Sequence, residues 1–236
     1  MRRPPPRPLT DRIRHTRTRQ GLRNPAFTQG RTVMSTDETP RTLLVTAHPD
    51  PGSLTHHIAE RLSTALRPGA TEIADLQQEG FDPRFTSADR RAYQEGGGHP
   101  PDVVREQQRL DQATDLVLVF PVYWWSVPAL LKGWIDRVFV NGWAFEYSAT
   151  GGVLPKLQRL TTHLLPIAGA DASAYERHGY ETALRTQLTH GLIDYVGSHR
   201  GATAFVHDSE QPSTEAAVDH AVRTLVGAVG APVSRS

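Results

Sequence analysis

The sequence predicts an α/β fold: a doubly wound, five-stranded parallel sheet of order 2-1-3-4-5, with helices on both faces and three layers in all. One observation predicts it. From Thr42 onward, short apolar runs alternate five times with amphipathic segments, and repeated strand–helix units require a parallel sheet covered on both faces. No repeat of fixed period and no linker interrupt the pattern, so residues 40–230 are expected to form one domain.

The individual elements follow from the apolar periodicity. The expected strands are the apolar runs at 42–47, 72–75, 115–120, 160–167 and 202–206. After the first of them, leucine or isoleucine recurs every four residues from Leu54 to Leu66, which is one face of a helix, and Ser53 is a suitable N-cap. The expected helices span 53–66, 101–113, 127–140, 183–193 and 214–229, with a short helix inside 81–98.

Composition and charge exclude several classes of protein. The 236 residues contain no cysteine, so disulfides, thiolate metal sites and cysteine nucleophiles are ruled out, and a cytoplasmic location is expected. No uninterrupted apolar run is long enough to cross a membrane. Removing the nine arginines and one acid of residues 1–33 from totals of 26 and 25 leaves 17 basic and 24 acidic residues, a net charge of −7. Such a domain has no general attraction for nucleic acid or anionic membranes.

Residues 1–33 differ in kind from the rest. They are rich in arginine and proline and poor in aliphatic side chains, which is typical of a disordered segment. A nucleic-acid-binding arm and an arginine-rich transit peptide are the functional alternatives. The sequence from Met34, Met-Ser-Thr-Asp-Glu, is typical of a bacterial start, so we expect Met34 to be the initiator and the leader to be an artefact of start assignment.

The loop after the first strand is suited to a phosphate. In a sheet of this order, ligands bind where the strand order reverses, between the first and third strands. The loop there reads His-Pro-Asp-Pro-Gly-Ser-Leu-Thr at 48–55, with the hydroxyls of Ser53 and Thr55 at a helix N-terminus. Free amides, the helix dipole and hydroxyl donors bind anions, although simple N-capping by Ser53 explains the same residues. The chain has no G-x-G-x-x-G and no Walker A motif, which disfavours a Rossmann-type site.

The loop after the third strand is aromatic. It reads Pro-Val-Tyr-Trp-Trp-Ser-Val-Pro at 121–128. Filling the core is the simpler explanation for Trp124 and Trp125, but tryptophans in a core seldom occur in adjacent pairs, because neighbouring side chains point in different directions. Exposing them is costly unless a flat ligand covers them. A planar ring system with polar edges, such as a flavin, fits backbone amides beside aromatic rings. The two loops together predict a site with a phosphate end and a ring end.

These stretches resemble the flavodoxin-like NAD(P)H:quinone oxidoreductases, the group that contains DT-diaphorase and the bacterial drug-modulator and general-stress flavin reductases. The resemblance extends over about 42–206, and the block at 120–139 is its most specific part. The matching stretches lie at 47–55, 80–83, 95–107, 120–139 and 144–147.

The resemblance implies two sets of flavin contacts. The residues that would hold the phosphates and the ribityl chain are His48, Gly52, Ser53, Leu54 and Thr55. The residues that would hold the isoalloxazine ring are Pro121, Val122, Tyr123, Trp124 and Trp125. In the third flavin loop only Gly169 and Tyr175 match, because Ile167 and Ala168 stand where the family commonly has threonines.

The resemblance also implies the chemistry. NAD(P)H would pass hydride to flavin N5 and leave, and a quinone or similar small electrophile would then use the same pocket, which gives ping-pong kinetics. Phe145 and Tyr147 would line that pocket, with Phe145 lacking the tyrosine hydroxyl that is usual there. Tyr175 and His178, the latter at an altered spacing, are the candidate catalytic residues. A homodimer, no metal, and either FAD or FMN are implied.

Two alternatives belong to other classes of protein. Ala-His-Pro-Asp also opens the zinc-dependent deacetylases of N-acetylglucosamine derivatives, but Pro51 replaces their second aspartate, and His56 and Glu60 are more simply an exposed pair on one helix face. A non-enzymatic role, as an electron-carrier flavodoxin or an ancillary subunit of a transporter, is compatible with the same fold. A carrier needs no substrate pocket, against which Phe145 and Tyr147 argue.

Overall fold

A single parallel sheet organises the part of the chain that the computed structural model describes, which is residues 41–67, 69–95, 97–148, 151–211 and 214–231. The strand order is β2-β1-β3-β6-β7, all parallel, so the predicted order 2-1-3-4-5 is confirmed. The strands are β1 (Thr42–Thr46), β2 (Thr71–Asp75), β3 (Asp115–Pro121), β6 (Thr161–Ile167) and β7 (His199–Thr203). The expectations about residues 1–33 and Met34 fall outside the described residues.

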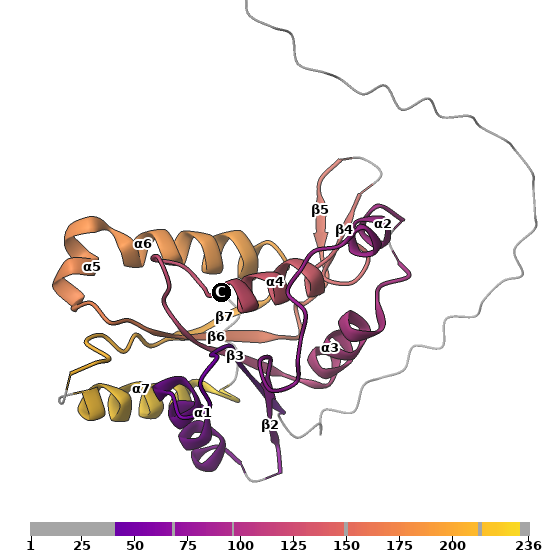
Figure 1. Ribbon diagram of the computed structural model, residues 1–236. Helices are drawn as coiled ribbons and strands as arrows, with labels where there is room; N and C mark the ends of the chain where they lie inside the picture. The colour runs from indigo at the N-terminus through magenta and orange to yellow at the C-terminus, as the bar shows by residue number, and fades with distance from the viewer. Residues whose placement is uncertain (1–40, 68, 96, 149–150, 212–213, 232–236) are drawn as a thin grey trace, which may run out of the picture. The chain divides into compact units, whose positions relative to one another are not determined.

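Helices cover both faces of the sheet (Figure 1). One layer consists of α1 (Leu54–Ala65) and α7 (Thr214–Ala228). The other includes α3 (Pro101–Gln112), α4 (Ala129–Val138) and α6 (Tyr180–Arg185), which continues into the π-helical η1 (Thr186–Asp194). Two short helices complete the described part: α2 (Ser87–Glu95) and α5 (Ala172–His178). None of the described helices is long and apolar enough to span a membrane.

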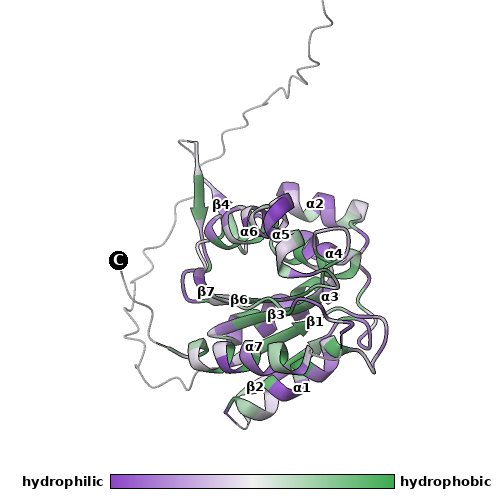
Figure 2. Ribbon diagram, turned by 90° about the vertical axis from the view of Figure 1, so that its left-hand side faces the viewer, coloured by the Kyte–Doolittle hydropathy of each residue, from purple (hydrophilic) through white to green (hydrophobic). Residues whose placement is uncertain are grey.

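The sheet has a separate apolar core on each face. Leu44 and Val117 pack with Ile58 of α1 and Val218 of α7 on one side. On the other side, alternate residues such as Leu116 pack against the helices of the second layer. Every residue of β3 is buried, as expected for the central strand of a sheet covered on both faces. Figure 2 shows these hydrophobic strands between helices that carry their hydrophilic residues outside.

The last strand begins earlier than its apolar run predicts. β7 spans His199–Thr203, whereas the run at 202–206 continues beside β6 through single bonds such as Val206 N to Pro166 O, 3.0 Å. The pairing shifts register near Thr162. An edge strand is buried on fewer sides, so polar residues such as Arg200 can belong to it. The hairpin of β4 (Phe145–Tyr147) and β5 (Val153–Pro155) and the helix α5 were not expected.

Several of the family-like residues hold the fold together. Gly133 of α4 lies so close to Pro83 that an added Cβ would stand 2.2 Å from the proline carbonyl oxygen. The buried Arg137 guanidinium donates to Asp89 (3.0 Å) and Asp102 (2.6 Å). These contacts join three of the matching stretches, so their match reflects packing as well as chemistry.

Candidate functional site

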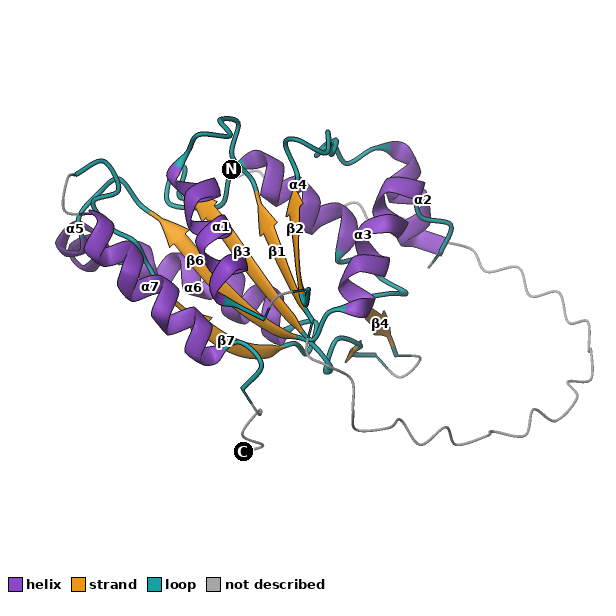
Figure 3. Cartoon of the chain, turned by 90° about the horizontal axis from the view of Figure 1, so that it is seen from below, coloured by secondary structure: helices purple, strands orange, loops and turns teal. Residues whose placement is uncertain are grey.

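The carboxyl ends of all five strands meet at one edge of the sheet (Figure 3). The loops after β1, β3 and β6, and the segment after β7, therefore lie along that edge. In doubly wound folds this edge binds ligands.

The loop after β1 ends in a capped helix with two free amides. Ser53 is the N-cap of α1, and its Oγ accepts from the His56 amide at 3.4 Å. The Gly52 amide donates to Asp50 Oδ1 at 2.9 Å. Within the described residues, the amides of Leu54 and Thr55 have no hydrogen-bond acceptor. Capping and anion binding are thus compatible, because the cap leaves two donors at the positive end of the helix dipole.

A buried chain of hydrogen bonds lies directly beneath this loop. Ser53 Oγ and His56 Nδ1 are 2.8 Å apart, and His56 Nε2 is 2.7 Å from Asp75 Oδ2 at the end of β2. His56 and Asp75 are 8% and 9% exposed. The expectation of an exposed pair between His56 and Glu60 is therefore wrong, because α1 turns His56 inward onto the neighbouring strand.

The loop after β3 contains a strained turn. The backbones of Tyr123 and Ser126 exchange two hydrogen bonds of 3.0 Å, and between them Trp124 and Trp125 have φ of 47° and 64°. Two residues at positive φ define the turn that normally takes Asn-Gly, and bulky residues in that conformation are strained, which is common at functional sites. Trp124 is 92% exposed, as the sequence predicts for a loop tip.

Trp125 and Tyr175 lie in one aromatic cluster at this edge. The Trp125 ring stacks on Tyr180, with centroids 3.6 Å apart and planes 9° from parallel. Tyr175, in α5, presents its edge to Trp125 at 5.7 Å and is 3% exposed. Burial raises the pKa of the Tyr175 phenol above its ordinary value, so the hydroxyl is protonated at neutral pH and can donate a hydrogen bond.

The other candidates at this edge are placed as follows. Val122 belongs to the end of the sheet, because its amide donates to Ile167 O at 2.8 Å, and Pro121 is the last residue of β3. His48 is half-buried, and its Nδ1 lies 3.0 Å from the Asp50 amide. Gly169 lies between β6 and α5, where a Cβ would meet only Glu210, at 3.8 Å.

Sequence reasoning missed three aromatic neighbours of Tyr175, which are Tyr180, Phe205 and His207. The ring centroid of His207 lies 4.9 Å from that of Tyr175, and its Nδ1 is buried without a hydrogen-bond partner. His178 is exposed in the last turn of α5, its ring 5.2 Å from Tyr180. The signal for His207 was its place directly after an apolar run, as for His48.

Phe145 and Tyr147 lie away from these loops. Their strand β4 pairs with β5, which ends at Pro155, shortly before β6 begins, so both residues lie at the amino-end edge of the sheet (Figure 3). Phe145 is buried among tyrosines and is 5.1 Å from Tyr195 between centroids. The hydroxyls of Tyr147 and Tyr93 are 2.9 Å apart, which raises the pKa of Tyr93 to about 12.

The α4 side of the sheet contains a cavity. This cavity of about 380 Å³ lies between α4 and η1. Ser126 and Gln187 line it near the aromatic turn, and Phe145 and Tyr195 line it near the tyrosine cluster. The lining mixes aromatic and apolar side chains with polar ones such as Lys132 and Asp136, and a cavity of this size is typical of small-molecule sites.

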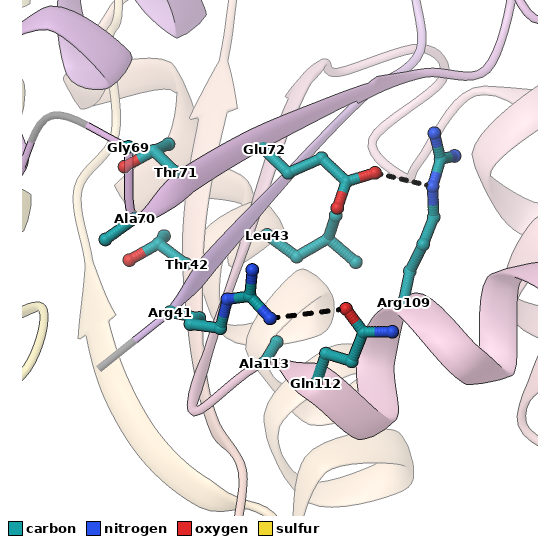
Figure 4. A pocket seen from close by; sticks show the side chains of 10 residues that line it. All are labelled: Arg41, Thr42, Leu43, Gly69, Ala70, Thr71, Glu72, Arg109, Gln112 and Ala113. Carbon is teal, nitrogen blue, oxygen red and sulfur yellow. Dashed lines mark hydrogen bonds and ion pairs between the residues drawn. The ribbon is translucent and has the colours of Figure 1, made fainter. Parts of the chain in front are cut away.

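The pocket in Figure 4 is not part of this site. It holds about 60 Å³ beside the first residues of β1 and β2. Arg109 is bound to Glu72 at 2.8 Å, and Arg41 to Gln112 at 3.4 Å. The two arginines that line this pocket are therefore engaged in contacts between elements of the fold. The residues that the structure describes include no group of three or more His, Asp or Glu side chains arranged to hold a metal ion.

Comparisons with known proteins agree with this architecture. A family model described as a flavodoxin-like fold matches residues 40–227. NAD(P)H dehydrogenase (quinone) 1 of Rattus norvegicus is 30% identical over 179 residues, which cover 66% of this chain and 65% of the rat protein. The chain thus spans slightly less than two thirds of that relative.

Two solved structures show the same fold. The NAD(P)H:quinone oxidoreductase of Methanothermobacter marburgensis aligns with a TM-score of 0.71 at 22% identity, over 80% of this chain and 96% of that one. An FMN-dependent NADH-azoreductase of Bacillus anthracis, in complex with FMN, aligns with a TM-score of 0.58 at 16% identity, over 80% and 97%.

Proposed function

Because the chain belongs to the family of proteins with a flavodoxin-like fold, we propose that it is a flavin-dependent oxidoreductase that transfers hydride from NAD(P)H to a quinone or similar small electrophile. One observation carries the proposal: two free amides at the N-terminus of α1 and a strained tryptophan turn lie at the same edge of one sheet. The rat relative is named a quinone dehydrogenase, and the Bacillus anthracis neighbour holds FMN.

The strand ends fit a flavin. Two buried polar atoms there have no hydrogen-bond partner, Thr46 Oγ1 at the end of β1 and His207 Nδ1 beyond β7, and such atoms in native proteins call for an explanation such as a ligand or water. A phosphate at the α1 N-terminus would accept from the Leu54 and Thr55 amides. The ribityl chain would pass His48.

The ring end is formed by the aromatic turn. The residues that we propose to contact the ring are Pro121, Val122, Tyr123, Trp124, Trp125 and Gly169. Backbone amides of the turn would face the polar edge of the ring, and the fixed Trp125–Tyr180 stack holds the turn in place. The bound flavin would accept hydride and return two electrons.

Tyr175 and His178 are the proposed catalytic residues. The buried Tyr175 hydroxyl can donate a hydrogen bond to negative charge that develops in the site, since its raised pKa keeps it protonated. His178 is exposed beside Tyr180, and its proposed role is to supply a proton to the reaction.

A second copy of the chain completes the proposed site. Phe145 and Tyr147 lie at the edge of the sheet opposite to the aromatic turn. In a homodimer the exposed Tyr147 would line the quinone and nicotinamide pocket of the partner, with the buried Phe145 packed against its ring, 5.6 Å away between centroids. Tyr147 is 54% exposed and available for such a contact. We propose that the protein is cytoplasmic and that residues 40–230 form its single flavin-binding domain.

Anaerobic titration of the purified chain with NADPH or NADH tests the proposal. After incubation with FMN or FAD and removal of the excess, we expect a yellow protein whose absorbance near 450 nm bleaches with the nicotinamide and recovers when benzoquinone is added. A protein that retains neither flavin contradicts the proposal. One that binds flavin but accepts no hydride is the electron carrier or ancillary subunit instead.

A further inference from the structure

The hydrogen bonds beneath the α1 N-terminus give two further residues a role. We propose that Asp75 and His56 position the Ser53 hydroxyl toward the cofactor phosphate, and that His56 takes up one proton when this phosphate binds. The inference rests on the proposed function, since it requires a flavin phosphate beside Ser53.

Without a ligand, the hydroxyl of Ser53 is committed to His56. An ionised carboxylate only accepts hydrogen bonds, so the single ring proton of neutral His56 lies on Nε2 and points to Asp75 Oδ2, 2.7 Å away. Nδ1 then carries a lone pair, and the hydroxyl of Ser53, 2.8 Å away, must donate to it. Ser53 therefore presents only lone pairs to a ligand, and its hydroxyl cannot donate to a phosphate.

A second ring proton reverses this arrangement. With protons on both nitrogens, His56 donates from Nδ1 to Ser53 Oγ and still donates to Asp75 from Nε2. Ser53 then accepts from the ring and from the His56 amide, and its own O–H is free to donate to a phosphate oxygen. The proton comes from solvent and resides on Nδ1, so no covalent bond to the ligand forms.

Asp75 is held in place to accept the charged ring. Its Oδ1 accepts from the amides of Gln77 and Gln78, each at 3.1 Å, which leaves Oδ2 for His56. An imidazolium in a nearly buried position needs such a partner. Thr46 pairs in register with Asp75, so it faces the same side of the sheet, and its Oγ1 is buried without a partner.

The other charged groups near this end of α1 can be named. Asp50, in the loop before the helix, is engaged with the Gly52 amide, from which its Oδ1 accepts at 2.9 Å. The ring of His48 is 6.3 Å from it between centroids, and Glu60, one turn further along α1, is exposed. β1 and β3 present only uncharged side chains at this end of the sheet. The carboxylates of α7 are bound to Arg61. Asp75 is therefore the carboxylate in direct contact with the His56 ring.

Calorimetric titration in two buffers of different ionisation enthalpy tests the proposal. The full chain is titrated at about pH 8, where free FMN phosphate is already a dianion because its second pKa is about 6. The probes are FMN, FAD and riboflavin, which has no phosphate. We expect uptake of up to about one proton per FMN, since one ring nitrogen is free to take it, and clearly less with riboflavin.

Three variants locate the proton. H56Q is expected to abolish the extra uptake and to weaken FMN binding about tenfold, as for loss of a hydrogen bond to a charged group, while riboflavin binding is unchanged and shows that the variant is folded. The S53A variant keeps the imidazole of His56 but is expected to lose the extra proton uptake on FMN binding. His57 is exposed on the same turn, and H57Q is the matched control that keeps the uptake.

The outcomes separate the inference from the proposed function. Equal proton uptake with FMN, FAD and riboflavin, or uptake that survives in H56Q, overturns the role of His56 and leaves the flavin site standing. A wild-type chain that binds none of the three probes overturns the proposed function and this inference with it.

Discussion

The two edges of the sheet each contain a buried histidine–aspartate pair, and the pairs differ in what the second ring nitrogen contacts. At the amino-end edge, His163 Nε2 is 3.1 Å from Asp115 Oδ1, and its Nδ1 accepts from the Ala202 amide at 3.0 Å. At the carboxyl-end edge, the second nitrogen of His56 faces the Ser53 hydroxyl.

This difference makes the pair of His163 a fixed structural contact, whereas the pair of His56 can change its protonation state. A backbone amide can only donate, so Nδ1 of His163 must stay without a proton. A hydroxyl can donate or accept, so His56 can change its protonation state without losing its contact. Both edges have glycines at positive φ, such as Gly69 and Gly80, but the carboxyl-end edge also places Trp124 and Trp125 in that conformation. Strain and adjustable hydrogen bonds thus occur together at the proposed site.

The largest effect is expected from breaking the fixed pair. Asp115→Ala leaves His163 and the Gly230 amide without their acceptor, and we expect the free energy of unfolding to fall by about 3–5 kcal/mol. Asp75→Ala, at the more accessible edge, should cost about 1–3 kcal/mol. Urea denaturation of both variants measures the difference. Equal losses would contradict the distinction between the pairs.

The next largest effect is expected from replacing a glycine by alanine at each edge, at Gly201 and at Gly52. A Cβ on Gly201 would stand 2.5 Å from His163 Nδ1, whereas on Gly52 it would meet only Asp50 Oδ1, at 3.4 Å. We expect Gly201→Ala to cost about 1–3 kcal/mol of stability and to leave flavin affinity unchanged.

Gly52→Ala should do the opposite, with near-normal stability and weaker FMN binding, because its methyl group would project beside the phosphate. Thermal unfolding and fluorescence titration with FMN check both variants. A loss of flavin affinity in Gly201→Ala would show that the two edges are not independent.

A smaller effect is expected from the strained turn. Trp124→Gly removes a bulky residue from positive φ and should raise the free energy of unfolding by about 1 kcal/mol. Gly69→Ala, with no atom within 4 Å of the added Cβ, introduces such strain and should lower it by about 1 kcal/mol. Chemical denaturation checks the signs. A Trp124→Gly protein that is less stable would show that the exposed ring contributes contacts.

The smallest effect is expected in the dependence of the free energy of unfolding on acid pH. Burial opposes ionisation of Asp115, but hydrogen bonds from His163, Thr114 and the Gly230 amide outweigh it, and the pKa of this carboxyl lies below its ordinary value. A lowered pKa contributes stability above the unfolded-state pKa of about 4, and this contribution is lost as pH falls further. Asp115→Asn should therefore show a flatter fall in stability below about pH 4 than the wild type. Parallel curves would contradict this.

The sequence predicted those features that depend on near neighbours along the chain. The apolar runs defined the strands, because a strand buried on both faces must be apolar throughout. The spacing from Leu54 to Leu66 defined the face of α1, and Ser53 its start. Strand–helix alternation, with the handedness of the connections, then restricted the order of the sheet.

Contacts between residues that are far apart in the chain could not be predicted from the sequence. His56 meets Asp75 across 19 positions, and Trp125 stacks on Tyr180. Such contacts depend on strand register and on the direction in which each helix turns a side chain. The start of β7 was mispredicted for a related reason, since an edge strand tolerates polar residues that a central strand does not.

Local periodicity thus determined the strands, most of the helices and the two unusual loops, because each of these follows from burial patterns within about ten to fifteen residues. Only the tertiary structure decided that Gly133 accommodates Pro83, that His56 is buried on Asp75, and that Phe145 and Tyr147 lie at the edge opposite to Trp125. These are packing relations, and close packing is satisfied by the whole set of neighbours at once.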